Sequence, residues 1–300
     1  MQISVNGEPL ALDTGAMAKL GEALSAADEL LETGGFIIVG LRLDGKALDA
    51  ESLAQVKDLA LAEAGQVDID AQPLSEIKVK AVETLLEFVS LAGEAAAGKG
   101  QGDWPALASG LGELAEAFAG LFSADELSFV QSFAALVGRT LAENPPAAKE
   151  ELRAEIGFQA DRLALVFKER LQEIQSPIEE MRKTAALYES QVGELKDLPV
   201  LLQTGKDERA MKAVLLFIEI FNKVIRLIPE LERRGLDSSA LRVAGEELPA
   251  FYSSFNDILR RLSTAFEDRD SVLIGDLAEY EVAPRMSEFF GAIEEALPKP

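Results

Sequence analysis

The first seventy or so residues of this 300-residue chain are patterned unlike the rest, and Pro73 marks the boundary. Before Pro73, several segments alternate apolar with polar residues, as at Ile3 and Val5; beyond it, apolar residues recur every three or four residues almost to the end. Alternation is typical of strands with one buried face, and the wider spacing is typical of amphipathic helices. The sequence therefore predicts an α+β protein, with a small sheet domain over residues 1–72 and a large all-α helical-bundle domain over residues 73–300.

The first 72 residues carry a signal for each element of a small sheet. Asn6-Gly7 is a turn dipeptide that favours a tight hairpin, and alternating apolar residues flank it on both sides. The elements expected after this hairpin are a helix over 17–31, a strand over 36–43, a turn at Asp44-Gly45, an ambiguous helix or compact loop over 49–64, and a last strand over 67–71.

This order of elements resembles the β-grasp (ubiquitin-like) fold. The residues that carry the resemblance are Met1 to Gly7, the strand Ile37 to Leu43 with Asp44-Gly45-Lys46, and Gln66 to Ala71. Sulfur carriers and protein modifiers of this family act through a free C-terminal Gly-Gly. Here the last strand continues into Gln72-Pro73-Leu74, so the resemblance implies a small interaction or assembly module and not a carrier.

Proline and glycine breaks divide the remaining chain into about seven or eight amphipathic helices, which favour antiparallel bundles. The expected helices begin with caps at Ser75, Ser123 and Ser176, and a break at Asn144-Pro145-Pro146 separates two of them. A hinge is expected near residues 98–104. The helix over 210–234 is the most hydrophobic, and its apolar residues cover most of its circumference, which is typical of a helix in the middle of a bundle or beneath a partner. The last helix is expected over 272–297.

The composition excludes many kinds of site, because the chain contains no histidine and no cysteine. These residues are the most frequent nucleophiles, general bases and transition-metal ligands. The 29 basic and 52 acidic residues give a net charge of −23, which disfavours nucleic-acid and anionic membrane partners. With no readable signal peptide and no segment apolar enough for a membrane span, we expect a cytoplasmic protein. Because histidine and cysteine are absent, we also expect no cofactor, metal or catalytic site.

Two motifs match known binding loops only in part. Gly93 to Gly100 has most of a P-loop pattern, but a helix precedes it and Gly100 replaces the hydroxyl residue that would hold magnesium. Asp268, Asp270 and Glu279 have calcium-loop spacing, but Val272 occupies the fifth position, a ligand position, and Leu273 the sixth, where the turn requires a glycine. A linker that ends a helix, and caps on the last helix, are the better interpretations.

Two segments remain as candidate binding sites. The loop Thr204-Gly205-Lys206 could take an anion on its backbone N–H groups, although Thr204 or Asp207 could simply cap the following helix. The segment from Asp276 to Glu281 could form an acidic docking face or a carboxylate-only magnesium site, although a solvated or internally paired face is the simpler interpretation. The candidate residues are Thr204, Gly205, Lys206, Asp276, Glu279, Tyr280 and Glu281.

These observations favour a non-enzymatic adaptor or scaffold that binds other proteins through helix faces and that could also associate with itself. A chaperone of the secretion or motility type is one alternative. An enzyme that uses carboxylate or lysine chemistry near the last helices is another. A scaffold should have an exposed apolar patch on a helix face or sheet edge, whereas an enzyme should have a deep pocket with convergent polar groups.

Overall fold

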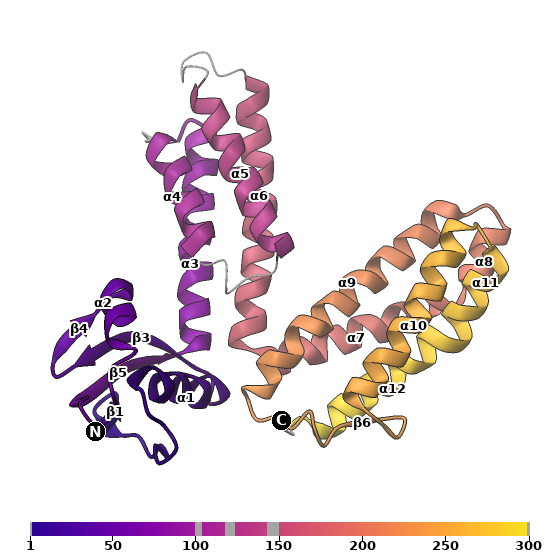
Figure 1. Cartoon of the computed structure of the whole chain (residues 1–300). Coiled ribbons are helices and arrows are strands. Elements are labelled where there is room, and N and C mark those ends of the chain that lie inside the picture. The colour runs from indigo at the N-terminus through magenta and orange to yellow at the C-terminus, as the bar shows by residue number, and fades with distance from the viewer. Residues whose placement is uncertain (1, 100–103, 118–123, 143–149, 299–300) are drawn as a thin grey trace. The chain divides into compact units, whose positions relative to one another are not determined.

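The computed structural model describes residues 2–99, 104–117, 124–142 and 150–298. It confirms the α+β class: a small N-terminal sheet domain precedes a large helical region (Figure 1). Contacts between residues divide the chain into two compact units, Met1–Leu171 and Gln172–Pro300. The first unit contains the sheet and the helices that follow it, and the second is helical apart from one short hairpin.

The sheet is mixed, with strand order β2-β1-β5-β3-β4. Strands β1 and β5 run parallel at its centre, and the other neighbours are antiparallel. Both expected turns are confirmed, because Asn6 and Asp44 have positive φ angles of 52° and 51°, each followed by a positive-φ glycine. The strands are β1 (Gln2–Val5), β2 (Glu8–Pro9), β3 (Phe36–Leu43), β4 (Lys46–Leu48) and β5 (Gln66–Pro73).

Helix α1 (Leu20–Thr33) packs on one face of this sheet. Its buried residues Leu20 and Leu24 form a core with Ile3, Val67 and Ile69 from the two central strands. The ambiguous segment contains a short helix, α2 (Ala50–Val56), whose first turn is capped by Asp49, which accepts a hydrogen bond from the backbone N–H of Ser52 (2.8 Å). The N-terminal domain thus buries one sheet face and leaves polar residues on the other.

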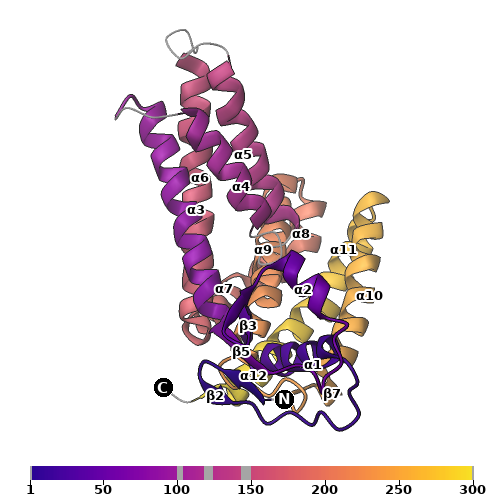
Figure 2. The ribbon, with the colours of Figure 1, turned by 60° about the vertical axis from the view of Figure 1, so that its left-hand side comes forward.

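Helix α3 (Leu74–Ala96) begins directly where β5 ends. The predicted cap at Ser75 is wrong: Pro73 ends the strand and precedes the helix, and the Leu74 N–H donates to the Gly35 carbonyl (2.8 Å). Figures 1 and 2 both show α4 (Trp104–Ala117) and α5 (Ala124–Ala142) side by side. Helix α6 (Glu150–Gln175) follows α5 in the chain. Most of the predicted hinge, Ser123 and the Asn144-Pro145-Pro146 break lie outside the described residues.

The second unit is built around one contiguous apolar core. At its centre, the fully buried rings of Phe251, Phe255 and Phe289 stack with centroid separations of 5.5 and 5.7 Å. Such aromatic pairs add to the stabilisation by burial. The elements are α7 (Pro177–Lys196), α8 (Leu198–Gln203), α9 (Asp207–Glu232), α10 (Leu248–Glu267), α11 (Ser271–Asp276), a π-helix (Leu277–Val282) and α12 (Ala283–Ala296).

One feature of the second unit differs from the expected all-α domain. A short hairpin of β6 (Arg242–Val243) and β7 (Glu246–Glu247) lies between α9 and α10, because Ala244 and Gly245 adopt positive φ angles of 51° and 85° and form a tight turn. The last helix has the expected extent, and a π-helical turn within it joins α11 to α12. The predicted cap at Asp270 is confirmed, since its carboxylate accepts hydrogen bonds from the first backbone N–H groups of α11.

Candidate interaction surface on helix α9

Helix α9 has one side that is fully packed. Its buried residues recur three or four apart, as expected for a helix that lies against a core on one side. In Figure 1, α7 runs alongside it, and Phe221 of α9 contacts Phe255 of α10 with ring centroids 5.3 Å apart. The core-facing side chains include Val214, Phe217, Ile220, Val224, Leu227 and Leu231.

The opposite side of α9 carries a second apolar row that nothing in the second unit covers. We call Met211, Leu215, Ile218, Asn222 and Ile225 the α9 ridge. The four apolar members are 45–52% exposed, and Asn222 is also exposed. Because the spacings are 4, 3, 4 and 3 residues, all five side chains lie along one face of the helix. The sequence predicted either burial or a covering partner for this helix, and this face is not buried.

The charged residues of α9 are unevenly paired. Every Lys and Arg of the helix has a carboxylate partner; these ion pairs are Arg209–Glu194, Lys212–Glu208, Lys223–Glu180 and Arg226–Glu173. By contrast, Asp207, Glu219 and Glu232 have no ion pair within the described part of the chain. They stand at the beginning, middle and end of the helix and are exposed. The surroundings of the α9 ridge therefore carry a surplus of negative charge.

Buried ion pairs fix how α9 sits on its neighbours. The Glu180 carboxylate of α7 is buried and accepts hydrogen bonds from Lys223 (2.9 Å) and Lys183 (3.0 Å). Burial alone would raise the pKa of Glu180, but these two ammonium groups outweigh it and hold the pKa below its usual value. The fully buried Glu173 takes two hydrogen bonds from Arg226, at 2.7 and 3.0 Å. These contacts orient α9 with its ridge outward.

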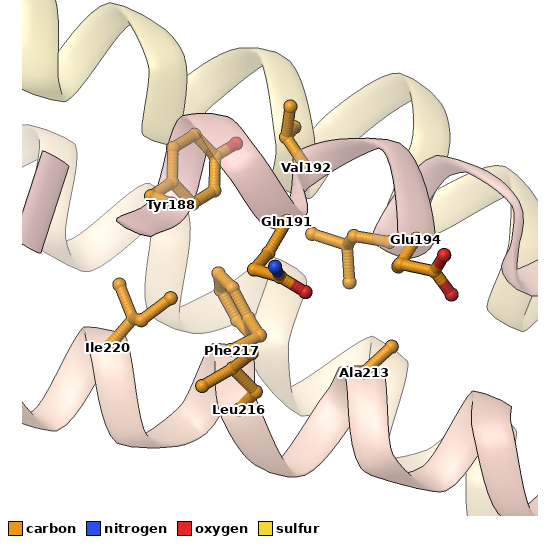
Figure 3. A pocket seen from close by; sticks show the side chains of 9 residues that line it. Tyr188, Gln191, Val192, Glu194, Ala213, Leu216, Phe217 and Ile220 are labelled. Atoms are coloured by element: carbon orange, nitrogen blue, oxygen red, sulfur yellow. The ribbon is translucent and has the colours of Figure 1, made fainter. Parts of the chain in front are cut away.

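A shallow hollow lies between α7 and α9 (Figure 3). It encloses about 260 Å³ together with the solvent at its mouth, which is below the usual size of a small-molecule site. Gln191 and Glu194 supply its polar groups, and Glu194 is already engaged by Arg209. The other lining residues are apolar or aromatic: Tyr188, Val192, Leu195, Ala213, Leu216, Phe217 and Ile220. The hollow thus suits a single apolar side chain better than a polar metabolite.

The candidate segment Thr204 to Lys206 closes α8. The Thr204 hydroxyl donates to the Val200 carbonyl (2.7 Å), and Gly205 takes a positive φ of 70°. The backbone N–H groups of Thr204, Gly205 and Lys206 donate to carbonyls of α8. The expected side-chain cap on α9 is wrong, because Lys206 is its N-cap residue and no side chain caps it. Since these N–H groups are already bonded, the geometry lends no support to anion binding, which stays a prediction.

The second candidate segment lies on α11 and the π-helix. Glu281 forms an ion pair with Arg261 of α10 (3.0 Å), while Tyr280 is 66% exposed. The neighbouring Glu279 carboxylate raises the pKa of Tyr280, with a smaller contribution from Asp276. Within the described ranges, no three acidic residues converge on a position where they could hold a metal ion. Internal pairing therefore accounts for Glu281, and docking through Asp276, Glu279 and Tyr280 stays a prediction.

None of the helices in the described part of the chain is both long and apolar enough to cross a membrane.

Comparisons with known proteins match both ends of the chain. A family model described as the TP0873 N-terminal domain matches residues 1–73, and a domain of unknown function, DUF8042, matches residues 179–291. The first match ends with β5, and the second includes all of α9. The chain is also similar to an uncharacterized protein of Treponema pallidum (strain Nichols), with 26% identity over 104 residues. That match covers 35% of this chain and 52% of the relative, so it spans about half of the relative's length. No solved structure matches the chain.

Proposed function

We propose that this chain is a non-enzymatic adaptor or scaffold that binds another protein through the α9 ridge. The observation that carries the proposal is a row of four half-exposed apolar side chains, with Asn222 among them, on a helix whose other side is already packed. Singly scattered apolar residues are ordinary at protein surfaces, but a contiguous row is typical of an interaction site. Covering the row with a partner would remove apolar area from water, which stabilises the complex by about 25 cal/mol for each Å² buried.

A second element of the proposal concerns the N-terminal domain, which we assign as a β-grasp-like interaction module. The support is its strand order, with two parallel central strands, antiparallel partners on either side and a helix on one face. Its last strand leads directly into α3, so it has no free C-terminal strand end like that of a protein modifier.

The test is site-specific photo-crosslinking in the cells that produce the protein. A photoreactive amino acid at Ile218, in the middle of the ridge, should give a discrete crosslinked protein band. The matched control is the same amino acid at Val272, which is 60% exposed on α11 of the same unit. The Ile218 band should disappear in a Leu215→Glu background. Equal crosslinking from both positions, or none from Ile218, would overturn the proposal.

A further inference from the structure

We infer that the partner covering the α9 ridge presents an amphipathic helix whose apolar stripe is flanked by Lys or Arg. This inference rests on the proposed function, because it names the chemistry of the partner for the same surface. It has two independent grounds: the spacing of the ridge residues, and the pairing of the charges around them.

The spacing of the ridge fits a helix better than a strand or a loop. The residues follow the alternating three-and-four spacing with which one helix packs its side chains into the holes of another. From Met211 to Ile225 the ridge is about 21 Å long at 1.5 Å per residue. The exposed Asn222 interrupts the apolar row near its C-terminal end. A polar residue at one such position selects a register, because its amide needs a polar group opposite.

The charges select a basic partner. All four cations of α9 already pair with carboxylates of this chain, so the charge left uncompensated along the helix is negative. The exposed carboxylates of Asp207, Glu219 and Glu232 are spread along the helix at intervals of 12 and 13 residues. Opposite charges across an interface steer encounter and fix register. A helix with Lys or Arg beside its apolar stripe would place positive charge near each carboxylate.

A second copy of this chain fits the same surface less well. It would bring an identical set of surplus carboxylates against the first set, within a protein of net charge −23. Like charges placed together cost free energy, and no cation of α9 is available to offset them. Charge therefore favours a basic helix over a homodimer.

The inference is tested with two designed 21-residue amphipathic peptides that share one apolar stripe. One peptide has Lys at all flanking positions and the other has Glu. Titrated into the full chain, the Lys peptide should bind about tenfold or more tightly than the Glu peptide, and added salt should weaken its binding. In the Glu219→Lys variant this preference should shrink, because affinity for the Lys peptide falls and affinity for the Glu peptide rises.

Variants separate ridge binding from general attraction to an acidic protein. Ile218→Glu, or Leu215→Glu if the first variant loses its fold by circular dichroism, should abolish binding of the Lys peptide, while Val272→Glu should leave it unchanged. The inference is wrong if both peptides bind equally, or if the Lys peptide still binds the Ile218→Glu variant. It is also wrong if light scattering shows a dimer that the Ile218→Glu substitution dissociates. Crosslinking at Ile218 without any preference for the Lys peptide would overturn this inference alone and leave the proposed function standing.

Discussion

The outward face of the N-terminal sheet and the outward face of α9 present opposite chemistry. On the central strands β1 and β5, the side chains that alternate with the core residues are polar, and several of them are hydrogen-bonded to neighbours within the domain. The Ser4 hydroxyl donates to Asp68 (2.5 Å), and Arg42 donates to Asp70 (2.6 Å). On α9, the outward face is apolar and has no neighbour in its unit. The polar groups of the sheet face need no further contact in water. Covering the exposed apolar area of the α9 ridge, by contrast, would be favourable in free energy.

This difference shows where the charges of the molecule are used. In the sheet, the Ser4–Asp68 and Arg42–Asp70 contacts each join two residues of the same face, so these groups need no partner. In α9, the cations are directed at carboxylates of the chain, and the surplus carboxylates border the apolar row. The exposed apolar area and the uncompensated charge of the α9 face therefore indicate the chemistry of its partner, whereas the sheet face indicates little about a partner.

The largest expected effect concerns the buried contacts that orient α9. Glu180→Ala should destabilise the second unit by about 3–5 kcal/mol, because Lys223 loses a buried counter-charge. Thermal and urea unfolding measure the change. The matched control is Glu208→Ala, which removes an exposed partner from Lys212 on the same helix and should have little effect. Equal losses from both variants would mean that the inner side of α9 does not determine which face is exposed.

A smaller effect is expected on the polar face of the sheet. Ser4→Ala removes a buried hydroxyl and its hydrogen bond, and should cost about 1 kcal/mol in urea unfolding. Arg42→Ala, which breaks a half-exposed ion pair, should cost less. Neither variant should alter binding of the Lys peptide. A loss of binding in either one would show that the sheet face also takes part in recognition, and the contrast with α9 would fail.

The sequence predicted most of the N-terminal domain because its turns are local. Asn6-Gly7 and Asp44-Gly45 define two hairpins by backbone conformation, and alternation defines the strands. The hairpin at Ala244-Gly245 was missed because alanine there gives no turn signal, although its φ is positive. The π-helical turn before α12 was missed because no glycine or proline lies within Leu277–Val282 to mark it.

The α9 ridge could be found from the sequence only in part. The spacing of Met211, Leu215, Ile218 and Ile225 is visible in the chain, but so is the spacing of the apolar residues on the opposite side. Two apolar faces on one helix predict that one of them needs a second neighbour. Which face the bundle takes depends on long-range contacts such as Lys223 with Glu180 and Arg226 with Glu173. Those contacts join residues 43 and 53 positions apart, and no local pattern encodes them.

The smallest expected effect is a change in the pKa of Tyr252, which responds to the negative charge at the C-terminal end of α9. Burial, and then the nearby Glu232 carboxylate, raise the pKa of Tyr252 to about 12. Because this pKa lies above the ordinary value of 10.0, the contribution of Tyr252 to stability is complete below pH 10 and is lost as the pH rises towards 12. Glu232→Gln should lower the pKa of Tyr252, although burial should keep it above 10. Carbon-13 NMR of labelled tyrosines follows the titration of each ring.

Glu219→Gln is the control for this titration, since Glu219 is not among the groups that raise the Tyr252 pKa. If a basic helix lies along the ridge, its positive charge should act on Tyr252 as the loss of Glu232 does. Adding the same peptide with Arg in place of Lys, which keeps its charge at this pH, should therefore lower the pKa of Tyr252, and the Glu peptide should not. If the pKa of Tyr252 is unchanged in Glu232→Gln, burial alone raises it. The Glu232 carboxylate would then exert no electrostatic effect that a partner could sense.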